Sequence, residues 1–310
     1  MKIVFMGTPQ IAVDSLQRLI DDGHEVVAVV TQPDKPKGRG KKMAMSPVKE
    51  LALKHNICVL QPEKASKPEF IDEIREINPD LVVVLAYGQI LKKDLLEIPK
   101  LGCINVHVSL LPELRGAAPI NWAIINGLKK TGITTMFMDA GLDTGDIIEA
   151  REFELNDEIT AGELHDWMMV EGAEILSSTI KKILKSDFTR TKQDNSKSTY
   201  APTLNKEMAH VDFSRSAREI HNLVRGINPW PGAWCEYGEN KMKIWKTCVL
   251  LDAGQNNEIG KITDVDKNGI VVLCGIGKLL IQEIQLPNKK RMAVSEYIKG
   301  NDIELGLILK

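Results

Sequence analysis

Short apolar segments alternate with amphipathic segments through the first half of this 310-residue chain. Four runs rich in β-branched residues are typical of buried strands, at residues 2–6, 25–31, 81–85 and 102–106. The run LVVVL at 81–85 is apolar at every position, which is typical of a strand covered by helices on both faces. The alternation predicts an α/β fold with a mostly parallel, Rossmann-like sheet.

Helical patterns fill the intervals between these strands. An apolar stripe predicts a helix at residues 12–20, and Ser46 and Pro47 supply an N-cap and a first helical position before residues 48–55. A long helix is predicted at residues 162–184. A further apolar stripe is formed by Phe70, Ile71, Ile74 and Ile77.

The composition changes near residue 186. Residues 186–205 are polar and have no apolar periodicity, which indicates a linker. After a helical segment at 217–224, five short strands are predicted at 233–237, 242–250, 260–264, 269–274 and 278–285. Strands at this spacing predict a small OB-like β-barrel. We therefore expect an α/β domain at 1–186, a linker at 187–205 and a β-barrel domain at 206–310.

Composition narrows the class of protein. The chain has 40 Lys and Arg against 42 Asp and Glu, so the whole molecule does not attract polyanions, although local basic patches are compatible with this balance. Five cysteines without a C-x-x-C pair favour a reducing compartment over a disulfide framework or a zinc site. No apolar run approaches membrane-spanning length, and the first residues enter a strand directly, so we expect a cytoplasmic protein.

Gly7, Thr8 and Pro9 follow the first predicted strand. Such a turn can hold a phosphate at a helix N-terminus, but the glycine pattern of a dinucleotide-binding turn is missing. No acidic residue ends the second strand where such a site needs one. An ordinary turn is therefore favoured, and a nicotinamide cofactor is not expected.

Asn105 and His107 occupy alternate positions of the fourth strand. Their side chains therefore point to one face, opposite Ile104 and Val106. Each could be only a satisfied polar residue of the core. Their place where the strand ends favours a ligand site, because ligands of open α/β sheets lie outside the carboxyl ends of the strands.

Asp143 lies in the segment GLDTGD, where Asp and Gly are also ordinary turn formers. With Asn105 and His107 it forms a chemical set, in which the amide is a neutral donor, the imidazole exchanges a proton, and the carboxylate orients the imidazole. Acyl transfer to an amine needs such groups, because a negative oxygen develops while the amine loses a proton. The sequence has no nucleophile-elbow pattern, which favours direct transfer without a covalent acyl-enzyme.

Several motifs resemble the folate-dependent formyltransferases, and within them the branch that acts on initiator methionyl-tRNA. The likeness covers nearly the whole chain. The set of Asn, His and Asp is shared by 10-formyltetrahydrofolate enzymes in general, whereas the basic segment, RGAAPI and NPWPGAW are more specific to the tRNA branch. The matching stretches are NVH, SLLPELRGAAPI and MDAGLDTGD, with MGTPQIA, TQPDKPKGRGKKMAMSPVK, AYGQIL, YAPTLNKE and INPWPGAW.

The resemblance implies roles for individual residues. Asn105, His107 and Asp143 are implied to be catalytic: Asn105 donates to the formyl oxygen, and His107, supported by Asp143, stabilises the oxyanion and takes part in proton transfer. Either His107 or a water bound to Asp143 removes the amine proton. Val108 stands where the family more often has Gly or Ala, a departure that concerns local shape. No metal is expected. The co-substrate 10-formyltetrahydrofolate is implied to lie against Ser109, Leu110, Leu111, Pro112, Tyr87 and Gly88.

Residues 33–42 carry five basic side chains between glycines and prolines. A charge run of this kind is by itself a solvated loop. The resemblance implies instead that the loop enters the acceptor end of initiator tRNA, with Arg39 as its key contact. Phosphate contacts of this kind supply affinity without base specificity. The implied tRNA-binding residues are Lys35, Lys37, Arg39, Lys41 and Lys42.

Two alternatives remain open from the sequence. An enzyme with this chemistry could formylate an amino sugar or a purine precursor, or an RNA-binding protein could carry an inactive formyltransferase domain. The basic loop and the barrel argue against the first, and the intact catalytic set argues against the second. We expect a monomeric enzyme that transfers a formyl group from 10-formyltetrahydrofolate to the α-amine of methionine on initiator tRNA.

Overall fold

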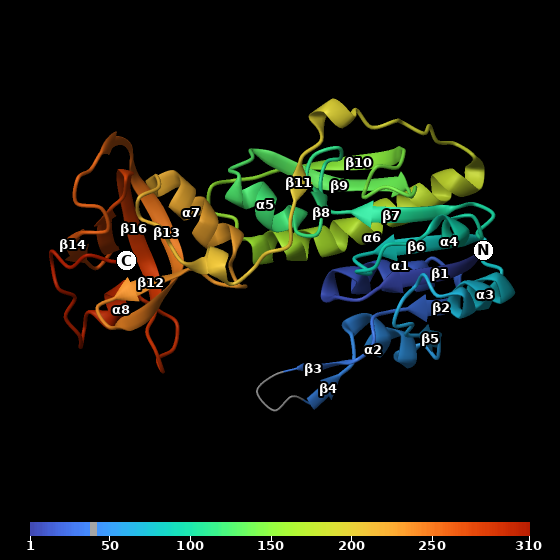
Figure 1. The fold of residues 1–310 in the computed structure, drawn as a ribbon, viewed down its shortest axis with the longest axis horizontal. Coiled ribbons are helices and arrows are strands. Elements are labelled where there is room, and N and C mark those ends of the chain that lie inside the picture. The colour runs from blue at the N-terminus through green and yellow to red at the C-terminus, as the bar shows by residue number, and fades with distance from the viewer. Residues whose placement is uncertain (38–41) are drawn as a thin grey trace. The chain divides into compact units, whose positions relative to one another are not determined.

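The computed structural model describes residues 1–37 and 42–310 and divides into two compact units (Figure 1). Unit 1 comprises residues 1–119, 131–153 and 165–201. Unit 2 comprises residues 120–130, 154–164 and 202–310. Two segments of unit 2 therefore fall between parts of unit 1 in the sequence. The domain limits that we predict from the sequence keep those segments with the first domain, and they stay a prediction.

Unit 1 is built on a seven-stranded sheet with the order β10-β9-β7-β6-β1-β2-β5. The pairs β1/β2, β1/β6, β6/β7 and β2/β5 are parallel, and β7/β9 is antiparallel. The predicted mostly parallel, Rossmann-like sheet is therefore confirmed. The strands are β1 (Lys2–Gly7), β2 (Glu25–Val30), β5 (Cys58–Leu60), β6 (Leu81–Leu85), β7 (Cys103–His107), β9 (Lys130–Phe137) and β10 (Ile147–Glu154).

Helices cover both faces of this sheet. The face that carries Val82 and Cys103 packs against α3 and α4. On the opposite face, Val106 of β7 lies beside Gly172 of α6, and Arg18 of α1 contacts the hydroxyl of Ser177 in α6. The helices are α1 (Val13–Asp21), α2 (Pro47–Lys54), α3 (Pro68–Ile77), α4 (Lys93–Leu96) and α6 (Ala161–Lys185), with the 3₁₀ turn η1 (Gln10–Ala12).

Local signals placed several of these elements correctly. The Ser46 hydroxyl accepts a hydrogen bond from the Lys49 N–H at 3.1 Å, so Ser46 is the predicted N-cap of α2. The sequence patterns did not reveal β5, β9 and β10. β5 has only three residues, β9 buries threonines in place of an unbroken apolar run, and the residues of β10 are half-buried or exposed.

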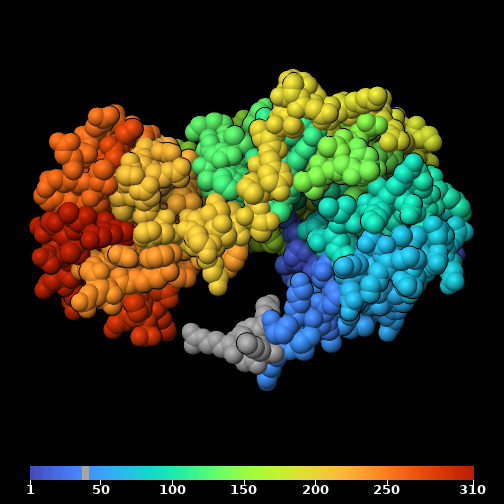
Figure 2. Space-filling view, in the orientation of Figure 1, coloured from blue at the N-terminus to red at the C-terminus, as the bar shows by residue number. Residues whose placement is uncertain are grey.

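Part of the segment that we predict as a linker makes ordered contacts within unit 1. β11 (Tyr200–Ala201) pairs in parallel with β8 (Arg115–Gly116), and Thr191 forms a bridge with Ile147 of β10. A 3₁₀ turn, η2, spans Asn195–Lys197. Figure 2 shows this part of the chain, in yellow, at the surface of unit 1. The segment is therefore packed against the residues that it crosses.

Unit 2 contains an antiparallel sheet with the order β12-β13-β16-β15-β14, and β17 pairs with β16. The predicted antiparallel, β-rich C-terminal part is confirmed, although β13 extends beyond the predicted end at residue 250. The strands are β12 (Trp234–Tyr237), β13 (Asn240–Gln255), β14 (Ile262–Asp266), β15 (Gly269–Leu273), β16 (Ile276–Gln285) and β17 (Met292–Ala293). The helical elements are α5 (Pro119–Ile125), η3 (Glu207–Ala209), α7 (Ala217–Gly226) and α8 (Val294–Tyr297).

Residues 307–310 join the two outer strands of this sheet. The Lys310 N–H donates to the Glu236 carbonyl of β12 at 3.2 Å. The Ile262 N–H of β14 donates to the Leu307 carbonyl at 2.9 Å, and Leu309 donates to Gly260 at 2.8 Å. Residues 307–310 thus cover both edges of the sheet and close it in a barrel-like manner.

Within residues 1–37 and 42–310, no helix combines the length and apolar character needed to cross a membrane. The five cysteines are free, and Cys103, Cys235 and Cys274 are buried. Burial raises the pKa of each of these three thiols to about 12. Their thiolate forms are therefore scarce at neutral pH.

Candidate active site

A cavity of about 580 Å³ lies in unit 1 where β1, β6 and β7 end. After β1 the chain adds β2 and β5 on one side of β1 within the sheet. It then returns and adds β6 on the other side of β1. The cavity therefore lies at the switch point where open α/β sheets bind their ligands. Its lining includes Pro9 and Ile11, residues 84–91, residues 105–108, and residues 138–145.

The three predicted catalytic side chains meet at this cavity. The carboxylate of Asp143 lies between the other two, with Oδ1 3.5 Å from Asn105 Nδ2 and Oδ2 3.8 Å from His107 Nδ1. Asn105 is half-buried and His107 is only 6% exposed. Both distances exceed those of strong hydrogen bonds. Their catalytic roles stay predictions.

The tautomer of His107 follows from its backbone contact. Nε2 lies 3.1 Å from the carbonyl oxygen of Leu114. Because a carbonyl oxygen only accepts, Nε2 carries a proton. In the neutral ring Nδ1 is then unprotonated, and this nitrogen is the one that faces Asp143. A proton taken up at Nδ1 would therefore be stabilised by the carboxylate.

Asp143 is held by the backbone of β8. Its Oδ2 accepts a hydrogen bond from the Gly116 N–H at 2.8 Å. Gly116 has a φ of +116°, and a Cβ there would lie 2.8 Å from the Ala201 carbonyl oxygen. The close approach of β8 and β11 therefore requires glycine at position 116.

The predicted folate contacts divide into two groups. Tyr87 and Gly88 follow β6 and line the cavity, whereas the residues of the predicted set from positions 109–112 are absent from its lining. The Ser109 hydroxyl, fully buried, donates to the Glu113 carbonyl at 2.6 Å, and the Leu111 N–H donates to Thr134 Oγ1 at 3.1 Å. Leu111 and Pro112 are joined by a cis peptide bond. Ser109 and Leu111 thus help to shape the loop after β7.

Burial raises the pKa of the Tyr87 hydroxyl to about 12. Among the residues that the structure describes, this hydroxyl has no hydrogen-bond partner, although Tyr87 is only 1% exposed. An unpaired buried hydroxyl costs about 1–3 kcal/mol in proteins. Tyr87 therefore lines the cavity, and its buried hydroxyl is an unused donor.

Of the predicted tRNA-binding residues, Lys35, Lys37 and Lys42 belong to a hairpin formed by β3 (Lys35–Lys37) and β4 (Lys42–Ala44). Lys35 and Lys42 are exposed. Arg39 and Lys41 lie outside the described residues. The base of the hairpin is fixed by an ion pair of 2.7 Å between Asp34 and Lys49, and the hydrogen bond from Lys49 lowers the pKa of the Asp34 carboxyl.

The sequence did not single out two side chains near Asp143. These are Gln193, which contacts the loop at residues 138–146, and Arg115, which contacts Gln193. The Gln193 amide donates to the carbonyls of Asp143 and Gly145, and Arg115 donates to Gln193. Gln193 stands in a polar segment without periodicity, so no local pattern distinguishes it. Arg115 belongs to RGAAPI, one of the stretches that carry the resemblance to the tRNA branch.

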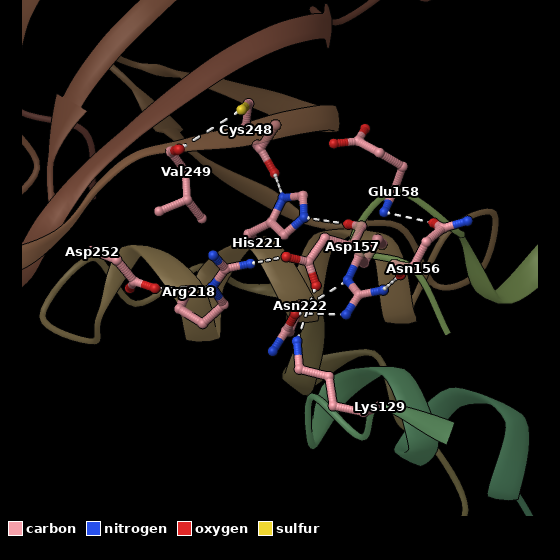
Figure 3. Close-up of polar contacts among 12 residues, drawn as sticks. Lys129, Asn156, Asp157, Glu158, Arg218, His221, Asn222, Cys248, Val249 and Asp252 are labelled. Atoms are coloured by element: carbon pink, nitrogen blue, oxygen red, sulfur yellow. Dashed lines mark hydrogen bonds and ion pairs between the residues drawn. The ribbon is translucent and has the colours of Figure 1, made fainter. Parts of the chain in front are cut away.

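Unit 2 contains a second cavity, of about 1000 Å³, with several charged residues in its lining. Figure 3 shows how these charges are paired. Arg218 contacts Asp157 at 2.9 Å and Asp252 at 3.1 Å, and Lys129 contacts Asp157 at 3.4 Å. Arg225 is buried and donates to the Asn156 carbonyl at 3.0 Å. This network links residues 156–159 to α7.

Within the described part of the chain, no group of three or more His, Cys, Asp or Glu residues is arranged to hold a metal ion. The groups available at the first cavity are instead an amide, an imidazole and a carboxylate. These groups can donate a hydrogen bond, accept a proton and stabilise the resulting cation. Such a site suits transfer of an acyl group to an amine.

The chain belongs to the formyl transferase family. The family described as "Formyl transferase" matches residues 1–180, and "Formyl transferase, C-terminal domain" matches residues 203–302. A curated relative, the methionyl-tRNA formyltransferase of Clostridioides difficile (strain 630), is 62% identical over 309 residues and covers all of both chains. The methionyl-tRNA formyltransferase of Ruminiclostridium cellulolyticum is 55% identical over 308 residues, which cover 99% of this chain and 98% of the relative.

Solved structures share the fold. The crystal structure of WlaRD, a sugar 3N-formyl transferase in the presence of dTDP and 5-N-formyl-THF, has a TM-score of 0.67 and 25% sequence identity. That match covers 94% of this chain and 99% of WlaRD. HypX from Aquifex aeolicus in complex with tetrahydrofolic acid has a TM-score of 0.59 and 15% identity, and it covers 99% of this chain and 50% of HypX. At that identity HypX supports the fold alone.

Proposed function

We propose that this protein transfers the formyl group of 10-formyltetrahydrofolate to the α-amino group of methionine on initiator tRNA. The structural observation that carries the chemistry is the position of the Asp143 carboxylate between Asn105 and His107 at the first cavity. The acceptor is supported by the full-length identity to relatives that are named methionyl-tRNA formyltransferase.

The first cavity has a suitable size and lining for the folate. Its volume of about 580 Å³ falls within the range of about 300–1,000 Å³ that small-molecule sites occupy. Tyr87 and the glycine at position 88 lie in its lining. The predicted residues Ser109, Leu110, Leu111 and Pro112 support the site through the loop after β7.

Asn105 and His107 have different roles in this proposal. Attack of the amine on the formyl carbon forms a C–N bond and places negative charge on the formyl oxygen, to which Asn105 donates a hydrogen bond. His107 accepts the amine proton at Nδ1, because Nε2 is engaged by Leu114. Asp143 stabilises the resulting imidazolium. The bond from the formyl carbon to the folate nitrogen then breaks, and the imidazolium returns a proton to that nitrogen.

The tRNA contacts are proposed for the hairpin and for the C-terminal part of the chain. Exposed Lys35 and Lys42 flank the segment that contains Arg39, so the hairpin brings positive charge to a nearly neutral protein. Phosphate contacts by such side chains supply affinity. Because one chain supplies all three catalytic groups, we propose a monomer, and we place the reaction in the cytoplasm.

A direct assay tests this proposal. The protein is incubated with 10-formyltetrahydrofolate and with methionyl initiator tRNA, methionyl elongator tRNA or a dTDP-linked amino sugar. We expect N-formylmethionine to be released from the initiator tRNA after mild hydrolysis, with much slower formation on the elongator. Formylation of the amino sugar alone would instead assign the chain to the chemistry named for WlaRD.

A further inference from the structure

We propose that Gln193 is a positioning residue for formyl transfer, because its side-chain amide fixes the loop that carries Asp143. This inference rests on the proposed function, since it concerns the same site. We define the Asp143 loop as residues 138–146, which connect β9 to β10. Gln193 reaches this loop from the segment that precedes β11, fifty residues further along the chain than Asp143.

The Gln193 amide binds the Asp143 loop at two points. Nε2 donates to the carbonyl oxygen of Asp143 at 2.9 Å and to that of Gly145 at 2.8 Å. Both protons of one NH₂ group are therefore used on two carbonyls of the same loop. A side chain that cannot donate would leave both carbonyls without this partner.

The Asp143 loop needs such an anchor. Asp143 has a φ of +52°, which non-glycine residues adopt infrequently. The loop forms no helix or strand of its own. At Gly145 a Cβ would overlap the carbonyl oxygen of Phe137, so the chain turns there against the end of β9. The position of the Asp143 carboxylate therefore depends on the contacts that fix the loop backbone.

Arg115 fixes the orientation of the Gln193 amide. Its Nε and Nη2 donate to Gln193 Oε1 at 3.1 Å and 2.6 Å. Because a guanidinium only donates, the oxygen of the amide must face Arg115 and the nitrogen must face the loop. The Nη2 atom of Arg115 also donates to Asn195 Oδ1 at 2.8 Å.

These contacts close a ring. Asp143 Oδ2 accepts from the Gly116 N–H at 2.8 Å, Gly116 follows Arg115 in β8, and Arg115 binds the Gln193 amide that holds the Asp143 carbonyl. The carboxylate and the main chain of Asp143 are thus held by one strand and by one side chain docked on it. Removing the Gln193 side chain opens this ring without altering the side chains of Asp143, Asn105 and His107 themselves.

Gln193→Glu and Gln193→Ala test the inference. Glu keeps the length of the side chain and an oxygen for Arg115, but it cannot donate to the two carbonyls. Because misplacement of a catalytic group by about 1 Å can cost up to about 100-fold, we expect each variant to lower kcat about 10-fold or more. KM for the folate should stay within about twofold, since Gln193 is not itself a residue of the cavity lining. Asn195→Ala, which removes an acceptor outside the ring, is the matched control and should keep its kcat.

A double-mutant cycle separates positioning from a general loss of structure. If Gln193 acts through Asp143, Gln193→Ala should lower kcat no further in an Asp143→Ala background. An equal loss in both backgrounds would overturn the inference. Wild-type protein that fails to formylate methionyl initiator tRNA would contradict the proposed function, whereas an active wild type with a fully active Gln193→Ala variant would contradict this inference alone.

Hydrogen exchange gives a readout that does not depend on activity. Backbone amides of residues 138–146 should exchange faster in Gln193→Ala than in wild-type protein, because the loop loses two anchors. Exchange in the same loop should be unchanged in Asn195→Ala. Identical exchange of the loop in Gln193→Ala and wild-type protein would overturn the inference.

Discussion

The Leu114 N–H donates to Oγ1 of Thr199 at 2.8 Å, and the carbonyl oxygen of the same Leu114 accepts from His107. Leu114 has a φ of +57°, so both of its backbone groups are held in an uncommon conformation. Thr199 and Gln193 belong to the same segment. Thr199 binds Leu114, whose carbonyl accepts from His107, and Gln193 binds the Asp143 loop. The orientations of the His107 ring and of the Asp143 loop therefore depend on residues 193–199.

Asp143→Asn isolates the charge of the carboxylate. The amide oxygen can still accept from the Gly116 N–H, but the side chain no longer stabilises a protonated His107. We expect kcat to fall roughly 100-fold, with little change in folate binding. Steady-state kinetics and folate titration measure both quantities. Asp146→Asn is the control, since Asp146 lies in the same loop and pairs with Arg190 at 3.0 Å; it should retain its kcat.

Replacing Asn105 or His107 by Ala tests the other two groups of the set. Asn105→Ala removes the proposed donor to the formyl oxygen, and we expect kcat to fall about 100-fold to 1,000-fold. His107→Ala removes the proton acceptor, and a loss of about 100-fold or more is expected. Turnover near that of the wild type in either purified variant would remove that residue from the mechanism.

Neutral substitutions on the hairpin test its contact with tRNA. Lys35→Gln and Lys42→Gln should each weaken tRNA binding and reduce the slope of log K against log salt by about one, if each side chain meets a phosphate. Arg39→Ala is expected to reduce discrimination between initiator and elongator tRNA. Binding titrations at several salt concentrations provide the measurement. Lys54→Gln, an exposed residue of α2, is the control, and an equal effect there would contradict a specific role of the hairpin.

His221 makes the stability of unit 2 depend on pH. Burial lowers the pKa of His221, whose Nε2 donates to the Asp157 carbonyl at 2.7 Å and whose Nδ1 accepts from Thr247 at 3.0 Å (Figure 3). The folded state therefore keeps the imidazole neutral at a pH where the unfolded chain, with a pKa of about 6.5, already binds a proton. The stabilisation is complete above that value and is lost as the pH falls toward the folded pKa.

Thermal unfolding at pH 7.5 and pH 5.5 measures this effect. His221→Gln keeps a donor for Asp157 and an acceptor for Thr247 but does not titrate. The decrease in Tm between the two pH values should be smaller in this variant than in the wild type. Equal decreases would show that another group controls the acid sensitivity.

Patterns within a few residues predicted most of the sheet and singled out Asn105 and His107, whose catalytic roles stay predictions. Asn105 and His107 share a face because side chains alternate along a strand, and Tyr87 lies near them because β6 is the neighbour of β7. The end of the strand that carries Asn105 and His107 indicated where a ligand site lies, and the cavity is at this place. This information is local, so a single sequence contains it.

Contacts between distant parts of the chain could not be predicted in this way. Gln193 is one polar residue among many in its segment, and its partners Asp143 and Gly145 lie about fifty residues away. The bonds from Arg225 to the carbonyls of Asn156 and Ile159 join segments separated by more than sixty residues. No periodicity in the sequence predicts such pairings.

The bridge made by residues 307–310 sets an order of events during synthesis. Edge strands β12 and β14 can form ladders with their neighbours before residue 307 exists, but their outer hydrogen-bonding groups remain open until that segment arrives. Open strand edges are templates for pairing with other chains. A nascent chain is therefore most exposed to aggregation when its sheet is nearly complete, and emergence of residues 307–310 from the ribosome ends that period.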